Sequence, residues 1–146
     1  MEYPERFIKG VPNSTLLTED NIPLASLMFD ESRDDQGRQD NNLESSINWE
    51  DDEGSLQILL KQKKANDKYQ FSAGAVFLSR DELDRISKNP TLKGRVSYER
   101  HPIEGNYYHG NLLLQKGLPK NTRNMIASHI AISCFIEHVP NKLAQS

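Results

Sequence analysis

Apolar and polar side chains alternate along both halves of Lys93–Gln115, on either side of a break at Gly105. Alternation with a period of two is typical of strands with one buried face. Folding the segment back at Gly105 predicts an antiparallel hairpin. Its opposed pairs are Val96 with Leu114, Tyr98 with Leu112, and His101 with His109. The first two pairs then share one face, which we expect to enter the core.

The opposite face of this hairpin is polar. It carries Ser97, Glu99, His101, His109 and Asn111, with Leu113 as its only apolar member. Directly opposed residues have Cβ atoms about 4.5–5.5 Å apart, so the two imidazoles are within reach of one metal ion or one phosphate. The simpler interpretation is a solvated outer face, because one side of an antiparallel sheet commonly meets water. The sequence leaves both interpretations open.

Other apolar runs predict further strands. They are Leu24–Phe29, Ser46–Glu50 and Tyr69–Leu78, with room for a short strand near Phe7–Ile8. The run at Tyr69–Leu78 is apolar on both faces, which indicates an interior strand. Gly74 within it indicates a bulge or a close backbone approach. Trp49 is expected to anchor the core.

Helical patterns occur in three places. Acidic residues at its start and lysines near its end favour a helix over Glu53–Ala65. Ser79 and Glu82 form a capping box that opens a short helix ending near Asn89. A long helix is predicted from Asn121 to His138. The apolar stripe expected to face the core on this helix carries Met125, Ile126, His129, Ile130, Ile132 and Ile136.

This order of elements predicts the α+β class. We expect a mostly antiparallel sheet of about five strands with two or three helices, the long C-terminal helix packing on one face. The strand–helix–strand unit over 46–78 is expected to add one parallel pair. A length of 146 residues predicts one domain, 1–146. Segments 1–21 and 30–45 are expected to be flexible loops, and 139–146 a tail.

Charge and composition argue against some classes of binding partner and against a membrane-spanning or secreted protein. A net charge of −3 and a pI near 5.8 argue against nucleic acid and anionic membranes, which require a basic surface. No apolar run approaches the ~20 residues of a membrane span, and the N-terminal residues lack the pattern of a secretory signal. Cys134 is the only cysteine, and its apolar surroundings favour a buried thiol over a nucleophile. We therefore expect a cytoplasmic protein.

Candidate chemistry rests on the polar face, because the sequence has no GxGxxG, P-loop, HExxH, paired CxxC or GxSxG motif. His101 and His109 are the candidate catalytic residues. One interpretation is a zinc site with Glu99 or Glu104 as third ligand. Another is a hydrolase in which one histidine acts as general base and Tyr107, Tyr108 or Asn111 polarises the substrate. The candidate ligand-binding residues are Glu99, Glu104, Asn106, Tyr108 and Asn111, and no metal ion or cofactor is assigned.

Several short motifs together resemble a loose pattern in a group of small uncharacterised bacterial proteins. The pattern has an early apolar strand, a Ser-x-Asn segment, an apolar strand with Gly, and an ending of Asp/His-Pro followed by Asn-Pro-x-His. The matching positions here are Leu24–Phe29, Ser46–Asn48, Gly74, His101-Pro102 and Asn106–His109. Tyr107 stands where the pattern has Pro. The resemblance implies a bacterial cytosolic protein that works with a partner, and it implies no known activity.

These observations favour a non-catalytic accessory domain that acts through a protein partner, a small ligand or a homo-oligomer. The alternative is a small hydrolase or metal-dependent enzyme that uses the His101 and His109 face. An accessory protein predicts that function depends on an exposed apolar patch and not on the two histidines. An enzyme predicts a concave pocket around those histidines, Glu99 and Asn111.

Overall fold

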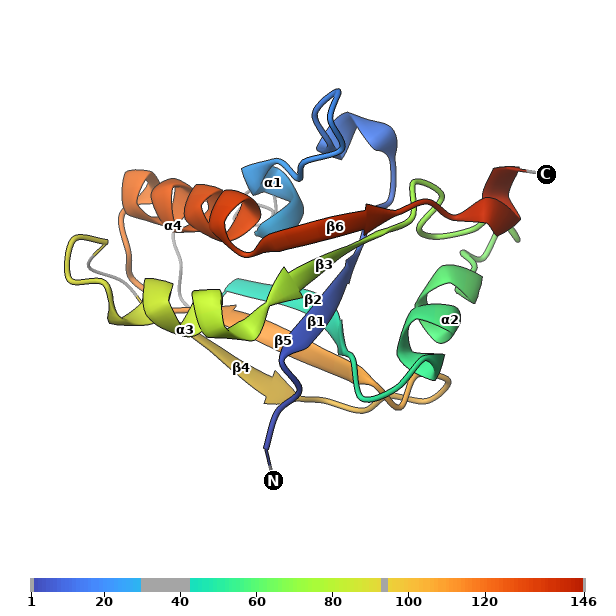
Figure 1. Cartoon of the computed structure of the whole chain (residues 1–146), viewed down its shortest axis with the longest axis horizontal. Coiled ribbons are helices and arrows are strands. Elements are labelled where there is room, and N and C mark those ends of the chain that lie inside the picture. Colours follow the sequence, from blue (N-terminus) through green and yellow to red (C-terminus); the bar gives the residue numbers. More distant parts are fainter. Residues whose placement is uncertain (1, 30–42, 93–94, 146) are drawn as a thin grey trace.

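The computed structural model describes residues 2–29, 43–92 and 95–145. Within these ranges the chain forms a six-stranded sheet in the order β4-β5-β2-β1-β3-β6, and every neighbouring pair is antiparallel (Figure 1). The strands are β1 (Arg6–Gly10), β2 (Leu43–Trp49), β3 (Ala75–Ser79), β4 (Val96–Arg100), β5 (His109–Leu114) and β6 (Phe135–Val139). The predicted α+β class is confirmed, with six strands where about five were expected.

Helices cover both faces of this sheet. The described helices are α1 (Ala25–Met28), α2 (Gly54–Lys61), α3 (Arg80–Lys88) and α4 (Lys120–Ser133), with 3-10 turns η1 (Ser14–Leu16) and η3 (Lys142–Gln145). Residues of α1, α3 and α4 share one core with the sheet, whereas α2 packs on the opposite face with Ile8, Ala75 and Phe77. The last α-helix therefore packs on one face, as predicted, and it lies beside α1 (Figure 1).

The larger core lies between the sheet and helices α1, α3 and α4. The strands contribute to it the buried side chains of Phe7, Ile47, Trp49, Val76, Leu78, Val96, Leu112 and Leu114. Trp49 is fully buried, and its ring contacts the rings of Tyr3, Phe7 and Tyr98. Aromatic pairs at these separations stabilise the folded state beyond the contribution that comes from burying their apolar surface. The expected role of Trp49 as a core anchor is confirmed.

Strands β4 and β5 form the predicted hairpin in the predicted register. Val96 pairs with Leu114, and Tyr98 pairs with Leu112. Beyond the strand ends, the His101 amide donates to the His109 carbonyl at 2.9 Å. The expected core face is confirmed, because three of these four apolar residues are buried and Tyr98 packs against them.

The centre of the sheet is occupied by β1. Segment 1–21 was expected to be loop with room for a short strand, yet β1 pairs with β2 on one side and with β3 on the other. Phe7 and Ile8 are fully buried in the cores on opposite faces of the sheet, which explains how so short a strand holds a central place. Of the expected 30–45 loop, residues 30–42 lie outside the described residues and 43–45 begin β2. The expected tail begins with the last residue of β6 and includes η3.

The prediction of a strand at Leu24–Phe29 is wrong. Ala25–Met28 forms the single helical turn α1, and Leu27, Met28 and Phe29 are buried in the larger core. A short apolar run fits a strand or a buried helical turn equally well, so its periodicity does not decide between them. Contact with α4 decides here in favour of the helical turn.

Three other element boundaries also differ from prediction. The helix expected over Glu53–Ala65 is shorter, and α2 ends at Lys61. Only Ala75–Ser79 of the expected Tyr69–Leu78 strand is extended, because Gly74 turns the chain at φ +100°. A Cβ on Gly74 would collide with the Val139 carbonyl, so the expected close backbone approach is confirmed. The helix predicted to reach His138 ends at Ser133, and β6 follows and pairs with β3. The expected parallel pair is wrong as well, since β1 separates β2 from β3.

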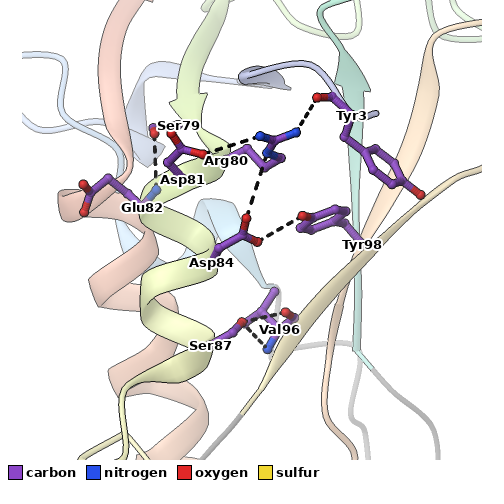
Figure 2. Close-up of polar contacts among 9 residues, drawn as sticks. All are labelled: Tyr3, Ser79, Arg80, Asp81, Glu82, Asp84, Ser87, Val96 and Tyr98. Atoms are coloured by element: carbon purple, nitrogen blue, oxygen red, sulfur yellow. Dashed lines mark hydrogen bonds and ion pairs between the residues drawn. The ribbon is translucent and has the colours of Figure 1, made fainter. Parts of the chain in front are cut away.

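Side chains of α3 connect this helix to β4 and to the N-terminal residues (Figure 2). Ser87 Oγ donates to the Val96 carbonyl at 2.6 Å and accepts from the Val96 amide at 3.1 Å. The Tyr98 hydroxyl donates to Asp84 at 3.0 Å, and the Arg80 guanidinium donates to the Tyr3 carbonyl. These bonds satisfy edge-strand groups and hold the hairpin in place over the core.

Candidate functional site

The predicted polar face lies on the side of the β4–β5 hairpin that is turned away from the larger core. We call it the hairpin polar face, and its residues are Ser97, Glu99, His101, His109 and Asn111. On this same side of the sheet, α2 packs against β1 and β2. The hairpin therefore brings together the candidate catalytic pair and two of the five candidate ligand-binding residues.

The two histidines meet where β4 and β5 join the loop. Their ring centroids are 5.6 Å apart with an angle of 64° between the ring planes. His109 Nδ1 lies 2.7 Å from the His101 carbonyl oxygen. A carbonyl oxygen only accepts, so Nδ1 carries the proton in this bond and Nε2 of a neutral His109 keeps its lone pair. The His101 ring makes no hydrogen bond within the described part of the chain, and its side chain is exposed.

Glu99 and Asn111 form the next cross-strand pair on this face. The Asn111 amide points to Glu99 Oε1 at 3.5 Å, a long and weak contact. The Glu99 backbone carbonyl lies 3.4 Å from the indole nitrogen of Trp49 on the core side. Glu99 is thus fixed through its backbone, while its carboxylate remains half-buried and only loosely held.

Asn106 has a structural role that the sequence did not reveal. It is 3% exposed, and its side-chain amide donates to Asn48 Oδ1 at 2.7 Å. Asn48 is fully buried and donates in turn to the Ser55 carbonyl at 2.9 Å. Asn106 Oδ1 accepts from the Tyr108 amide at 3.2 Å. Because both ends of the Asn106 side chain bind protein groups, this residue holds the loop against β2 and α2.

Tyr108 and Arg100 join the same loop region to the start of α2. The Tyr108 hydroxyl donates to Asp52 Oδ1 at 2.7 Å, and this hydrogen bond raises the pKa of Tyr108. Arg100 donates to both oxygens of Asp51 at 2.8 and 2.7 Å. A bidentate pair of this kind fixes orientation as well as distance. Of the other loop candidates, Glu104 is exposed and Tyr107 is 73% exposed.

The remaining titratable candidates lie elsewhere. His129 is exposed on α4, so its expected place in the core is wrong. His138 lies on β6, and its Nε2 is 2.7 Å from the Ala73 carbonyl. Cys134 is fully buried, and burial raises its pKa to about 12, so it stays a thiol at neutral pH. Across residues 2–29, 43–92 and 95–145, no cluster of three or more His, Cys, Asp or Glu side chains is arranged to hold a metal ion.

A second surface, on α4, was not anticipated from the sequence. Met125, His129 and Ile132 lie on the side of α4 opposite its buried residues, and we call this side the α4 outer face. Met125 is 49% and Ile132 69% exposed. Ile136, on the following strand, is 45% exposed. The stripe predicted to enter the core therefore divides, with Ile126 and Ile130 inside and these residues outside.

Comparison with known proteins identifies no family for this chain. No family model matches it, and neither the curated proteins nor the solved structures contain a significant match. The resemblance to small bacterial proteins stays a prediction. Among the described residues, no helix is both long and apolar enough to cross a membrane.

Proposed function

We propose that this protein is a non-catalytic accessory domain that binds a protein partner through the α4 outer face. The observation that carries the proposal is that α4 carries apolar side chains on its exposed side as well as on its buried side. Its inner side buries Ile126, Ala127, Ile130 and Ala131 together with Arg123, and its outer side exposes Met125 and Ile132. Apolar side chains that gather on the exposed side of a helix are typical of an interaction surface.

The outer residues form a continuous stripe. At 3.6 residues per turn, Met125, His129 and Ile132 fall within an arc of about 60° on the helix surface. The chain carries no charged residue between Asn124 and Ser133. By contrast, the outer positions of α3 include Asp81, Arg85 and Lys88. Met125 and Ile132 are already partly covered, so covering the rest of each side chain contributes roughly 1–2 kcal/mol, which favours a partner at this stripe.

The loop beside the histidines supports the same conclusion. Asn106 and Tyr108 were candidates for binding a ligand, yet their side chains bind Asn48 and Asp52. A residue whose hydrogen-bonding groups already bind the protein has fewer left for a substrate. The hairpin polar face therefore offers a hydrolase the two histidines, Glu99 and Asn111, but neither the Asn106 nor the Tyr108 side chain.

Site-specific photo-crosslinking in the cells that make the protein tests this proposal. A photoreactive residue at position 132 should give one defined adduct, either with another protein or with a second copy of the chain. The matched control is the same residue at Gln57, which is exposed on α2, and it should not give that adduct. I132E should prevent crosslinking from position 125 without lowering Tm. No adduct from position 132, or the same adducts from position 57, would overturn the proposal.

The second candidate function is a small hydrolase that uses His109 as general base. It is favoured by the hydrogen bond from Nδ1 to the His101 carbonyl, which orients the ring and leaves Nε2 able to accept a proton. Esters and phosphate esters with a chromogenic leaving group provide the test. Turnover by the wild type that H109A abolishes would favour the enzyme, and equal rates for both proteins would exclude this role.

A further inference from the structure

We propose that His101 and His109 together bind one divalent transition-metal ion of the Zn²⁺, Ni²⁺ and Cu²⁺ class. The inference goes beyond the proposed function, because it concerns the other side of the molecule and requires no partner protein. Neutral imidazole is a preferred ligand for these ions. The site is formed by two strand ends that the hairpin register holds together.

The separation of the two rings suits a shared ion. Zinc–nitrogen bonds are about 2.0–2.1 Å long, so two imidazoles on one ion have ring centroids about 5–6 Å apart at ordinary coordination angles. The observed separation is 5.6 Å. The backbone bond from the His101 amide to the His109 carbonyl, at 2.9 Å, fixes the two Cα positions. Because the His109 ring is held by its own hydrogen bond, the His101 side chain is the one that rotates to bring both rings to one ion.

The second ground is the hydrogen bond made by the His109 ring. Metal-binding histidines almost always donate their other ring N–H to a carbonyl or carboxylate, which fixes the tautomer and orients the ring. Nδ1 of His109 lies 2.7 Å from the His101 carbonyl oxygen and leaves Nε2 for the ion. His101 has no such contact in the described residues and retains both ring nitrogens as possible ligands.

The pair supplies two ligands, and water supplies the rest. In the described ranges no third His, Cys, Asp or Glu completes a cluster with them. Glu99, two positions before His101 on the same face, has a loosely held carboxylate that lies 3.5 Å from the Asn111 amide nitrogen. Such a site has open positions and exchanges its ion readily, unlike a closed structural zinc site. Its affinity should fall as pH is lowered, because protons compete with the ion for imidazole.

Calorimetric titration of tag-free protein with ZnCl₂ and with NiCl₂ tests the site. We expect one ion per chain, and we expect H101A and H109A each to weaken binding by at least about tenfold. H129A is the matched control, since His129 is exposed but lies alone on α4, and it should bind as the wild type does. Loss of binding in H129A, or equal binding by wild type and the H101A/H109A double variant, would overturn the proposal.

Further measurements show whether a variant has lost a metal ligand or has unfolded. They also test the metal site independently of the proposed partner surface. Circular dichroism and Tm of H101A and H109A should match the wild type. I132E should keep its zinc affinity, and H109A should keep the crosslink from position 132. In NMR spectra, zinc should shift the ring resonances of His101 and His109. Shifts confined to other histidines would contradict the assignment.

Discussion

Asn106 donates its side-chain amide to Asn48 Oδ1 at 2.7 Å, which joins two buried asparagines from the β4–β5 loop and β2. N106A would leave the Asn48 oxygen buried without a donor. An unsatisfied buried polar group costs about 1–3 kcal/mol, and we expect the free energy of unfolding to fall by that amount. Urea denaturation measures it. N124A, at an exposed position of α4, is the control and should change stability by no more than about 0.5 kcal/mol. Equal stability of N106A and wild type would show that water replaces the lost bond.

Gly110 lies directly beside the core tryptophan. A Cβ at this position would be 2.5 Å from Trp49 Nε1 and 2.6 Å from the Glu99 carbonyl oxygen. Overpacking of this kind costs about 1–3 kcal/mol, so we expect G110A to unfold at lower urea concentration and to shift the tryptophan emission. G117A is a useful control, because its Cβ would meet nothing within 4 Å and its φ of +81° gives backbone strain alone. G117A should therefore leave the emission unchanged. An unchanged emission spectrum in G110A would contradict the close packing.

The capping box at the start of α3 is only half formed. Ser79 Oγ accepts from the Glu82 amide at 3.3 Å, as predicted, but the Ser79 amide donates to the Cys134 carbonyl at 2.8 Å. The Glu82 carboxylate instead pairs with Arg85. We expect S79A to lower stability by about 1 kcal/mol. E82A should lower it by less than about 0.5 kcal/mol, because the Glu82 pair with Arg85 is largely exposed. Thermal denaturation measures both changes in stability. A larger loss of stability in E82A would indicate that Glu82 also binds the Ser79 amide, as in a complete capping box.

Cys134 should be inert to thiol reagents in the native protein. Only the thiolate reacts, and burial raises the Cys134 pKa to about 12, so the thiol stays protonated far above pH 8. At pH 8 we expect no reaction with an aromatic disulfide reagent until urea unfolds the chain, and one thiol per chain afterwards. The rate in native protein should follow the fraction unfolded as urea increases. A fast reaction in native protein at pH 8 would show that solvent reaches the sulfur.

Local patterns predicted the parts of the fold that local physics decides. The alternation around Gly105 fixes which side chains of the hairpin share a face, and Ser79 marks the start of α3. Leu24–Phe29 was mistaken for a strand because six apolar-rich residues fit either structure, and only packing against α4 decides between them. The strand β6 was missed because its partner β3 lies far away in the sequence.

The candidate site was predictable to the same extent. The hairpin register brought His101 and His109 together, as expected from spacing alone. The inward turn of Asn106 depends on Asn48, which is 58 positions away, and no local signal reports such a bond. The division of the apolar residues of α4 into a buried and an exposed set also depends on which side of the helix faces α1, and apolar residues on both sides carry no mark of that choice.

Because β1 lies inside the sheet, removing residues from the N-terminal end should damage the fold more than removing residues from the C-terminal end. β1 is synthesised first and lies between β2 and β3, whereas β6, near the other end of the chain, is an edge strand. Removing β6 would remove an edge strand and leave β3 without its partner on that side. Trimming residues 2–10 would divide the sheet between its three-strand and two-strand halves. Asn141 is fully buried and donates to the Leu60 and Phe71 carbonyls, so fusion tags and proteolytic sites are better tolerated after η3 than close to Arg6.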